Sequence, residues 1–270
     1  MIRSLALVVV FVLINTSCSS APEKQYRVTK YLELTNTWMA RGDRKRQEEK
    51  LDLALSNYDT GLKYANLRND LTLMGVLQLK KATIYINQSR FEFALKLIEQ
   101  AKALHKYEGA ELKLPIRALE AKLAHAQGRF KEASASALAL SEAYKDDNER
   151  SIYYRWLGVM YSSDSIMLWE EMDRDLRSLD NLKARGELEN IEILSFVVYN
   201  NALWKVRDKH AQAQIAIEQA IAHFSELELT NKIRDCYALA VKLYKAQGNE
   251  DKAAYFLKRL DSFNPYLKAQ

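Results

Sequence analysis

The sequence contains few of the residues that interrupt α-helices. It has 3 prolines and 8 glycines in 270 residues, where average usage would give about 13 and about 19. Alanine, leucine, lysine, glutamate and glutamine, which favour helices, dominate instead. Alternating strand patterns joined by turn pairs such as Asn-Gly are absent as well. The composition therefore excludes a β-rich domain and predicts an all-α fold.

Cysteine is also scarce, and the position of one of the two cysteines is informative. Cys18 follows Arg3, the ten apolar residues 5–14 and the small polar residues 15–17. A basic start, a short apolar stretch and small residues before a cut are typical of a secretory signal peptide. The apolar stretch is about half of the roughly 20 residues that a membrane-spanning helix needs. The sequence therefore predicts export and cleavage rather than a permanent anchor helix.

A cysteine directly at the predicted cut resembles the lipobox of bacterial lipoproteins. The resemblance rests on Thr16, Ser17 and Cys18. It implies a signal peptide at residues 1–17, acyl chains including palmitate on Cys18, and a tether at residues 18–26. Ser19 resembles the residue found in lipoproteins sent to the outer membrane, so the implied location is the outer membrane of a bacterium, facing the periplasm. An ordinary secretory signal and an uncleaved anchor are the alternatives.

The remaining cysteine and the net charge limit the partners further. If Cys18 is acylated, Cys236 has no cysteine to pair with, so an intramolecular disulfide is excluded. Cys236 lies in an apolar helical pattern, which is typical of a buried and inert thiol. The net charge falls from +5 to +4 when Arg3 leaves with the predicted signal peptide, and the run 44–46 is the one basic cluster. This mild charge does not indicate a nucleic-acid surface.

A short pattern recurs along the chain at nearly equal spacing. A polar or glycine-containing turn precedes an alanine on a new apolar stripe, and these alanines are Ala54, Ala94, Ala133, Ala213 and Ala253. Their spacings are 40, 39, 80 and 40 residues. The gap of 80 holds one further unit, whose second helix, from about 166 to 182, lacks the alanine. The chain is thus predicted to contain about six helix–turn–helix units with a period near 40 residues.

These units resemble tetratricopeptide repeats. The segment 154–161 matches the first helix of that family, and Ala253, Leu257, Leu260 and Pro265 match its second helix and terminal proline. The period is longer than the usual 34 residues. The resemblance implies a right-handed α-solenoid over residues 27–270, in which each hairpin buries its apolar face against its neighbours. Another stacked array of helical hairpins or a plain helical bundle is the alternative.

The sequence lacks the motifs that would indicate catalysis or a metal site. None of the histidines has a second histidine or cysteine three or four residues away, and they are His105, His125, His210 and His223. A glycine-rich phosphate loop and the common serine-nucleophile motifs are absent. The many carboxylates alternate with basic residues, as on solvated helix faces. We therefore expect no enzyme activity, no cofactor and no metal.

The candidate partner-binding residues come from the resemblance. Tetratricopeptide arrays commonly hold an extended peptide or a partner's helix on a concave face lined by the first helix of each unit. Setting the clearer units in register places mostly basic residues there: Lys122, His125, Arg155, Lys205, Lys242 and Lys245. We therefore expect the groove to bind an acidic or C-terminal segment of another protein of the cell envelope. Simple solvation of these side chains is the alternative.

The expected function is that of a lipid-anchored, periplasm-facing scaffold or adaptor that binds a protein partner, with a role in envelope assembly. A peptide-sensing regulator is the first alternative, although repeat arrays of that kind usually carry a DNA-binding domain, which has no counterpart in the sequence. A cell-wall glycan binder or hydrolase is the second. It would require a cleft with two carboxylates about 5 to 9.5 Å apart.

Overall fold

The regular secondary structure consists of α-helices throughout the part of the chain that the structure describes. The structure is a computed structural model, and it describes residues 30–107, 111–162 and 169–268. The all-α prediction is confirmed for these ranges. The predicted signal peptide at 1–17, Cys18 and the tether at 18–26 lie outside them. No helix within the described ranges combines the length and the apolar character that crossing a bilayer would require.

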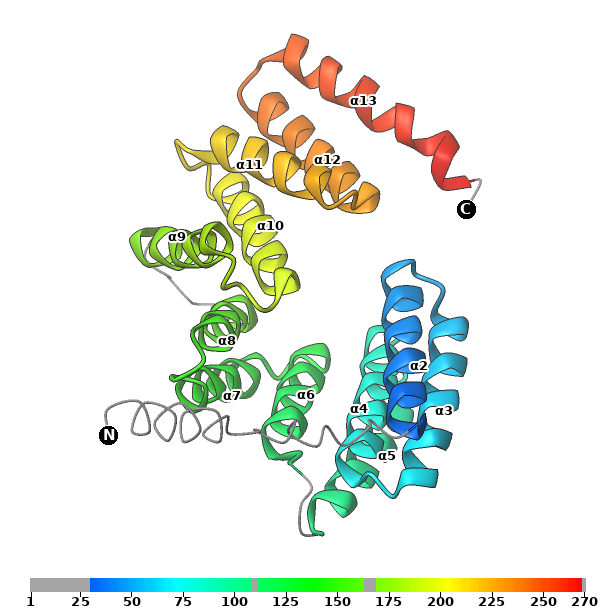
Figure 1. Cartoon of the computed structure of the whole chain (residues 1–270). Coiled ribbons are helices and arrows are strands. Elements are labelled where there is room, and N and C mark those ends of the chain that lie inside the picture. Colours follow the sequence, from blue (N-terminus) through cyan, green and yellow to red (C-terminus); the bar gives the residue numbers. More distant parts are fainter. Residues whose placement is uncertain (1–29, 108–110, 163–168, 269–270) are drawn as a thin grey trace, which may run out of the picture.

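Within the described ranges, the helices follow one another as six hairpins (Figure 1). In chain order the pairs are α2 (Lys30–Gln47) and α3 (Leu51–Arg68), α4 (Leu71–Asn87) and α5 (Phe91–His105), α6 (Lys113–Ala126) and α7 (Phe130–Ala143), α8 (Asn148–Tyr161) and α9 (Trp169–Arg185), α10 (Ile191–Arg207) and α11 (Ala213–Glu226), and α12 (Thr230–Ala246) and α13 (Glu250–Lys268). First helices of successive hairpins pack directly, as α10 does against α8 and α12. The first helices therefore form one layer of the array.

Particular residues fix the turns between helices and the points where helices begin. Gly128 and Gly248 have φ angles of 78° and 69° in the turns that precede α7 and α13. A side chain with a Cβ is strained in this left-handed region, so glycine is favoured there. Asp147 caps the start of α8, since its carboxylate accepts a hydrogen bond from the backbone N–H of Arg150 at 3.0 Å. These local signals set the boundaries of the repeated units.

The recurring alanines lie where the two helices of a hairpin meet. Each belongs to the first turn of a second helix and is at most 2% exposed: Ala54, Ala94, Ala133, Ala213 and Ala253. A small side chain at this point lets two helix axes approach closely. The register predicted from the sequence, with a period near 40 residues, is thereby confirmed in five of the six hairpins.

The fourth hairpin, α8 and α9, is built differently. Met172 and Leu179 are buried in α9 seven residues apart, the same spacing as Ala213 and Ala220 in α11. Met172 therefore occupies the alanine position with a bulky side chain. The backbones of α8 and α9 scarcely approach each other, although α9 does pack against α10. The predicted degeneracy of this unit corresponds to a hairpin whose two helices stand further apart.

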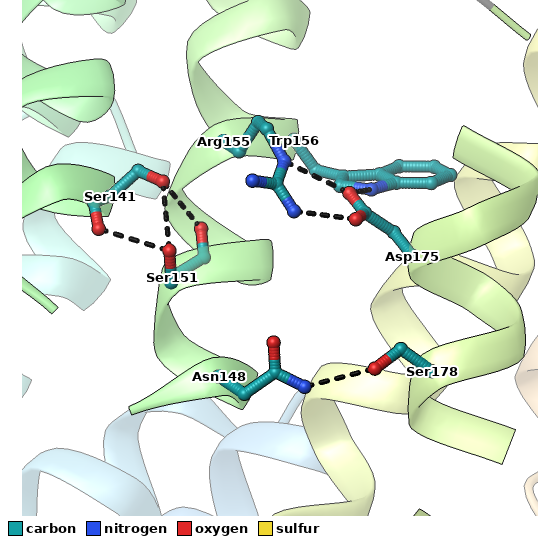
Figure 2. Close-up of polar contacts among 7 residues, drawn as sticks. All are labelled: Ser141, Asn148, Ser151, Arg155, Trp156, Asp175 and Ser178. Atoms are coloured by element: carbon teal, nitrogen blue, oxygen red, sulfur yellow. Dashed lines mark hydrogen bonds and ion pairs between the residues drawn. The ribbon is translucent and has the colours of Figure 1, made fainter. Parts of the chain in front are cut away.

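A buried carboxylate joins the two helices of this hairpin (Figure 2). Asp175 of α9 accepts hydrogen bonds at 3.0 Å from Nε of Arg155 and at 3.0 Å from Nε1 of Trp156, both on α8. At the other end of α8, Asn148 donates from Nδ2 to Ser178 at 3.0 Å. Polar contacts thus replace the close alanine packing of the other hairpins.

The successive hairpins follow a curved path (Figure 1). Nε2 of Gln47, at the end of α2, donates to a carboxylate oxygen of Glu192, at the start of α10, at 2.7 Å. These residues are 145 positions apart in the sequence. Along the chain, the first hairpin is connected to the fifth only through α4 to α9, so this contact closes the curve formed by the first helices. The enclosed space is where the candidate site lies.

Candidate binding hollow on the inner face

The first helices of five successive hairpins surround a single hollow of about 460 Å³, called here the inner hollow. Arg46 comes from α2, Lys80 and Thr83 from α4, and Lys122 from α6. The remaining polar wall is formed by tyrosines of α8 and by Glu192 at the start of α10. A volume of this size is within the range of ligand pockets in proteins, about 300 to 1,000 Å³.

Lys122 is the central charged group of the inner hollow. It is largely buried, and burial lowers the pKa of its amine to about 8, with a smaller contribution from the charge of Arg46. Among the described residues, Lys122 makes no hydrogen bond and no ion pair. An amine withdrawn from water without an opposite charge is unfavourable in its protonated form. The hollow therefore favours an anionic group at this amine.

The neighbouring cations differ in how far they are already neutralised. Nζ of Lys80 bonds to both carboxylate oxygens of Asp43 at 2.8 and 2.9 Å, and the hydroxyl of Tyr58 donates to the same carboxylate at 2.7 Å. Arg46, in contrast, has no carboxylate within ion-pair distance in the described residues. The uncompensated positive charge of the inner hollow thus comes from Arg46 and Lys122.

Tyrosines supply both apolar surface and hydrogen-bond donors. Tyr153 packs edge-to-face against Phe196 with ring centroids 5.0 Å apart, and Tyr154 stacks on Tyr144 at 5.4 Å. Burial raises the pKa of Tyr153, Tyr154 and Tyr161 well above the ordinary tyrosine value. Their hydroxyls are therefore neutral donors at physiological pH. A ligand group that carries an anion beside an apolar part would match both features.

Negative charge is sparse in the hollow. Among the residues that the structure describes, Glu192 is the only acidic one that lines it, and one oxygen of Glu192 accepts a hydrogen bond from Gln47. A glycosidase would need two carboxylates on opposite sides of its substrate, and the lining does not supply such a pair. Elsewhere in the described ranges, no three His, Cys, Asp or Glu side chains converge as a metal site would require.

The residues predicted from the sequence fall into three groups. Lys122 lines the inner hollow, and His125 stacks on Tyr161 at its edge with centroids 4.3 Å apart. Arg155 is bound to Asp175, and Lys205 is 3% exposed and bonded to Asp173 at 2.7 Å. A partner-binding role for any of these residues stays a prediction.

The third group consists of Lys242 and Lys245, which are exposed on α12 outside the inner hollow. Sequence reasoning did not select Arg46 or Lys80, which the curvature brings beside Lys122. The basic run 44–46 was the only sequence signal for Arg46.

Comparisons with known proteins support the fold. No protein-family model matches the chain, and no curated protein matches it by sequence. Among solved structures it is similar to a Rap protein crystallised in complex with competence and sporulation factor. That likeness has a TM-score of 0.57 and 15% identity, and it covers 90% of this chain and 78% of the Rap chain. The chain is an all-α solenoid of tetratricopeptide-like hairpins.

Proposed function

We propose that this protein is a non-catalytic adaptor that binds an anionic segment of a protein partner in the inner hollow. The observation that carries the proposal is the buried amine of Lys122, which has no hydrogen bond or ion pair in the described residues and lies among neutral tyrosine hydroxyls. A carboxylate of the partner would neutralise Lys122 and Arg46, while apolar atoms beside it would contact the tyrosine rings. The hollow sets the two uncompensated cations Arg46 and Lys122 against the single carboxylate of Glu192, so it favours anionic over cationic segments.

The similarity to a Rap protein is consistent with this use of the fold, since that protein was crystallised with a bound factor. It also supports a second candidate, a peptide-sensing regulator. The two differ in the ligand, which would be a segment of a larger partner in the first case and a free peptide in the second. Size-exclusion of the captured complex separates them, because a free peptide leaves the apparent mass almost unchanged.

The location of this adaptor is part of the proposal. Acyl chains on Cys18 would hold the array at the outer membrane, facing the periplasm, where it would serve envelope assembly. Support comes from the signal-like residues 1–17 and the cysteine that follows them. Cys18→Ala should move the protein from the membrane fraction to the soluble fraction. If Cys18→Ala stayed in the membrane fraction, the lipid anchor would be contradicted, but the proposal that the inner hollow binds a partner would not be affected.

Site-specific photo-crosslinking in intact cells tests the binding proposal. A crosslinking amino acid at Thr83, which lines the inner hollow, should capture a partner that mass spectrometry then identifies. Thr60 is a matched control, because each threonine hydroxyl bonds the backbone carbonyl four residues earlier at 3.0 Å. Thr60 lies on α3, outside the inner hollow. Equal capture from both positions would refute binding in the hollow.

Two variant sets locate the charge that the partner recognises. Lys122→Met should reduce capture from Thr83 at least tenfold if the anion binds in the inner hollow. Reversing the charge of Lys242 and Lys245 tests the wider groove expected from the sequence, since both are exposed on α12. If only the charge reversal of Lys242 and Lys245 abolished capture, the result would place the binding site on α12 and not in the inner hollow.

A further inference from the structure

Two lysines among the described residues line the inner hollow, and their amines differ in chemical state. Nζ of Lys80 forms an ion pair with Asp43 at 2.8 Å, and the same carboxylate accepts a hydrogen bond from Tyr58. The amine of Lys122 has no hydrogen bond and no ion pair in the described part of the chain. An opposite charge stabilises the protonated form of an amine. Lys80 is therefore held as an ammonium, whereas Lys122 lacks this stabilisation.

The surroundings of Lys122 favour a nucleophilic amine. A lysine becomes a nucleophile in proteins when it is withdrawn from water or placed next to another cation. Lys122 meets both conditions, because it is largely buried and the charge of Arg46 acts on it. Burial, with a smaller contribution from Arg46, lowers the pKa of the amine to about 8. Part of the amine is therefore neutral at physiological pH, and its free electron pair is available to attack a carbonyl carbon.

The cation next to this amine has no carboxylate of its own. Arg46 forms no ion pair in the described residues. Its charge acts on Lys122 and on Tyr153, which line the hollow from α6 and α8. A guanidinium binds a carboxylate through two parallel hydrogen bonds. A ligand that reacts with Lys122 and carries a carboxylate next to its reacting carbon would therefore find an ion-pair partner in Arg46.

Apolar side chains form another part of the wall. Leu79, Leu119 and Leu157 line the hollow from α4, α6 and α8, and each is at most 9% exposed. Leu119 precedes Lys122 by three residues, so the two side chains lie on the same face of α6. Pockets for small molecules commonly combine apolar walls with a few polar groups that fix the orientation of the ligand. The hollow of about 460 Å³ thus joins a nucleophile, a free cation and an apolar wall.

We propose that the inner hollow binds α-keto acids with an apolar side chain and that Lys122 holds them as a reversible imine. Nζ attacks the ketone carbon with its electron pair and forms a C–N bond. The carbonyl oxygen then leaves as water with the two hydrogens of the neutral amine, so that C=N replaces C=O and nothing is oxidised or reduced. The carboxylate of the acid pairs with Arg46, and its alkyl chain lies against Leu79, Leu119 and Leu157.

The imine would also regulate the proposed function. It uses the amine that the proposed function assigns to the anion of a protein partner, and the alkyl chain of the acid occupies the same hollow. A bound α-keto acid should therefore displace the partner. Only this competition rests on the proposed function, since imine formation depends on the residues of the hollow alone.

Reductive trapping on the full chain tests the imine directly. The protein is incubated with α-ketoisocaproate and cyanoborohydride, which reduces an imine to a stable secondary amine, and peptide mass spectrometry locates the modified lysine. We expect modification of Lys122 to exceed that of two internal controls at least tenfold. The controls are Lys80, which lines the same hollow as an ammonium, and Lys131, which is exposed on α7. Equal modification of the three lysines would overturn the proposal.

The carboxylate and the alkyl chain of the ligand are tested separately. Pyruvate, which lacks the branched chain, should require at least fivefold higher concentrations for the same trapping at Lys122. Methyl isobutyl ketone carries a methyl group in place of the carboxylate, and Arg46→Gln should reduce the preference for α-ketoisocaproate over this ketone at least fivefold. Arg44→Gln, an exposed change in the same basic run, should leave the preference unaltered. Equal trapping of pyruvate, or an unaltered preference in Arg46→Gln, would contradict the proposed ligand.

Two measurements on the parent protein distinguish this proposal from the proposed function, because crosslinking from Thr83 needs no carbonyl ligand and trapping needs no partner. Capture of a partner without selective trapping at Lys122 would overturn the imine alone. Trapping without capture would overturn the adaptor alone. Where both occur, purified protein modified by α-ketoisocaproate should capture at least fivefold less of the partner identified in cells. Undiminished capture by the modified protein would refute the competition.

Discussion

Lys122 is held in an environment that opposes its charge. The folded chain withdraws this amine from water and places Arg46 near it, and no carboxylate of the described residues compensates. Such a residue lowers the stability of the free protein. It raises the affinity for an anion by the same physical cause, because the anion removes the unfavourable charge. Function and stability are therefore opposed at this residue.

Replacing Lys122 by methionine should stabilise the protein at neutral pH. The pKa of Lys122 is about 8 in the folded chain and about 10.4 when unfolded. Because the pKa is lower in the folded chain, the charged amine destabilises the folded state by its full amount below about pH 8. Between about pH 8 and 10.4 the unfolded state binds more protons than the folded state, so the stability of the folded protein rises with pH and the penalty disappears. Lys122→Met should therefore raise the free energy of unfolding by about 2 to 3 kcal/mol at pH 7.

Urea denaturation at pH 7 and at pH 10 measures this effect. The gain should shrink to a small fraction at pH 10, since the lysine of the parent protein is then neutral in the folded state. Lys131→Met is the control, because Lys131 is exposed on α7. A gain of the same size at both pH values would mean that packing, and not charge, is responsible.

Asp175 is the opposite case, because its buried carboxylate accepts hydrogen bonds from two neighbouring side chains. Asp175→Ala would leave the buried Nε1 of Trp156 and the guanidinium of Arg155 without their acceptor. We expect the free energy of unfolding to fall by about 3 kcal/mol, since removing the carboxylate leaves these donors without a hydrogen-bond acceptor. Chemical denaturation followed by circular dichroism measures it. Asp235→Ala should cost less than about 1 kcal/mol, because its ion pairs are near the surface.

At the scale of elements, α7 and α8 are joined by a close approach at Gly158. A Cβ added there would lie 2.7 Å from both Cγ and Cδ2 of Leu138 and 3.4 Å from its backbone nitrogen. The hydroxyl of Ser134 also donates to the carbonyl of Gly158 at 2.7 Å. We therefore expect Gly158→Ala to destabilise the protein by about 1 to 3 kcal/mol, despite the higher helix propensity of alanine.

Gly61→Ala is the matched comparison in α3. The added methyl group would meet Leu77 at 3.4 Å, an ordinary contact distance, so the substitution should be neutral or gain about 0.5 to 1 kcal/mol. Thermal melts of both variants test the pair. If Gly158→Ala were as stable as Gly61→Ala, the close approach of α7 and α8 in the structure would be wrong.

The repeat pattern was predictable because it depends on local residues. Each recurring alanine follows a turn within a few positions, and burial at the hairpin crossing requires a small side chain. The fourth hairpin was not predictable in the same way, since Met172 and the buried carboxylate of Asp175 act through contacts between helices. Only the missing alanine indicated that α9 differs.

The candidate site was predictable only in part. Register along the first helices identified Lys122, which lines the inner hollow. It could not show that Arg155 and Lys205 would be bonded to carboxylates of α9, because that depends on how α9 lies against its neighbours. Nor could it bring Arg46 beside Lys122, since the curvature of the whole array decides that distance. The repeat period therefore predicts where each hairpin and its small residue lie, but not the side-chain contacts that one helix makes with another.

At the scale of the whole molecule, the core is divided along the array. One cluster of buried residues joins α4, α5 and α6 and includes Ile98, and the largest extends from α8 to α13 and includes Leu243. Repeat arrays of this kind derive their stability from nearest-neighbour packing. A local defect should therefore loosen nearby hairpins first, even though Gln47 and Glu192 close the curve.

Two core truncations test this division. Leu243→Ala and Ile98→Ala each remove a buried side chain and should each cost about 2 to 4 kcal/mol locally. Hydrogen exchange followed by mass spectrometry should show faster exchange in α10 to α13 for the first variant and in α4 to α6 for the second. Because each segment serves as the internal control for the other variant, no further control is needed. Faster exchange across all helices in both variants would mean that the closed curve unfolds as one cooperative unit.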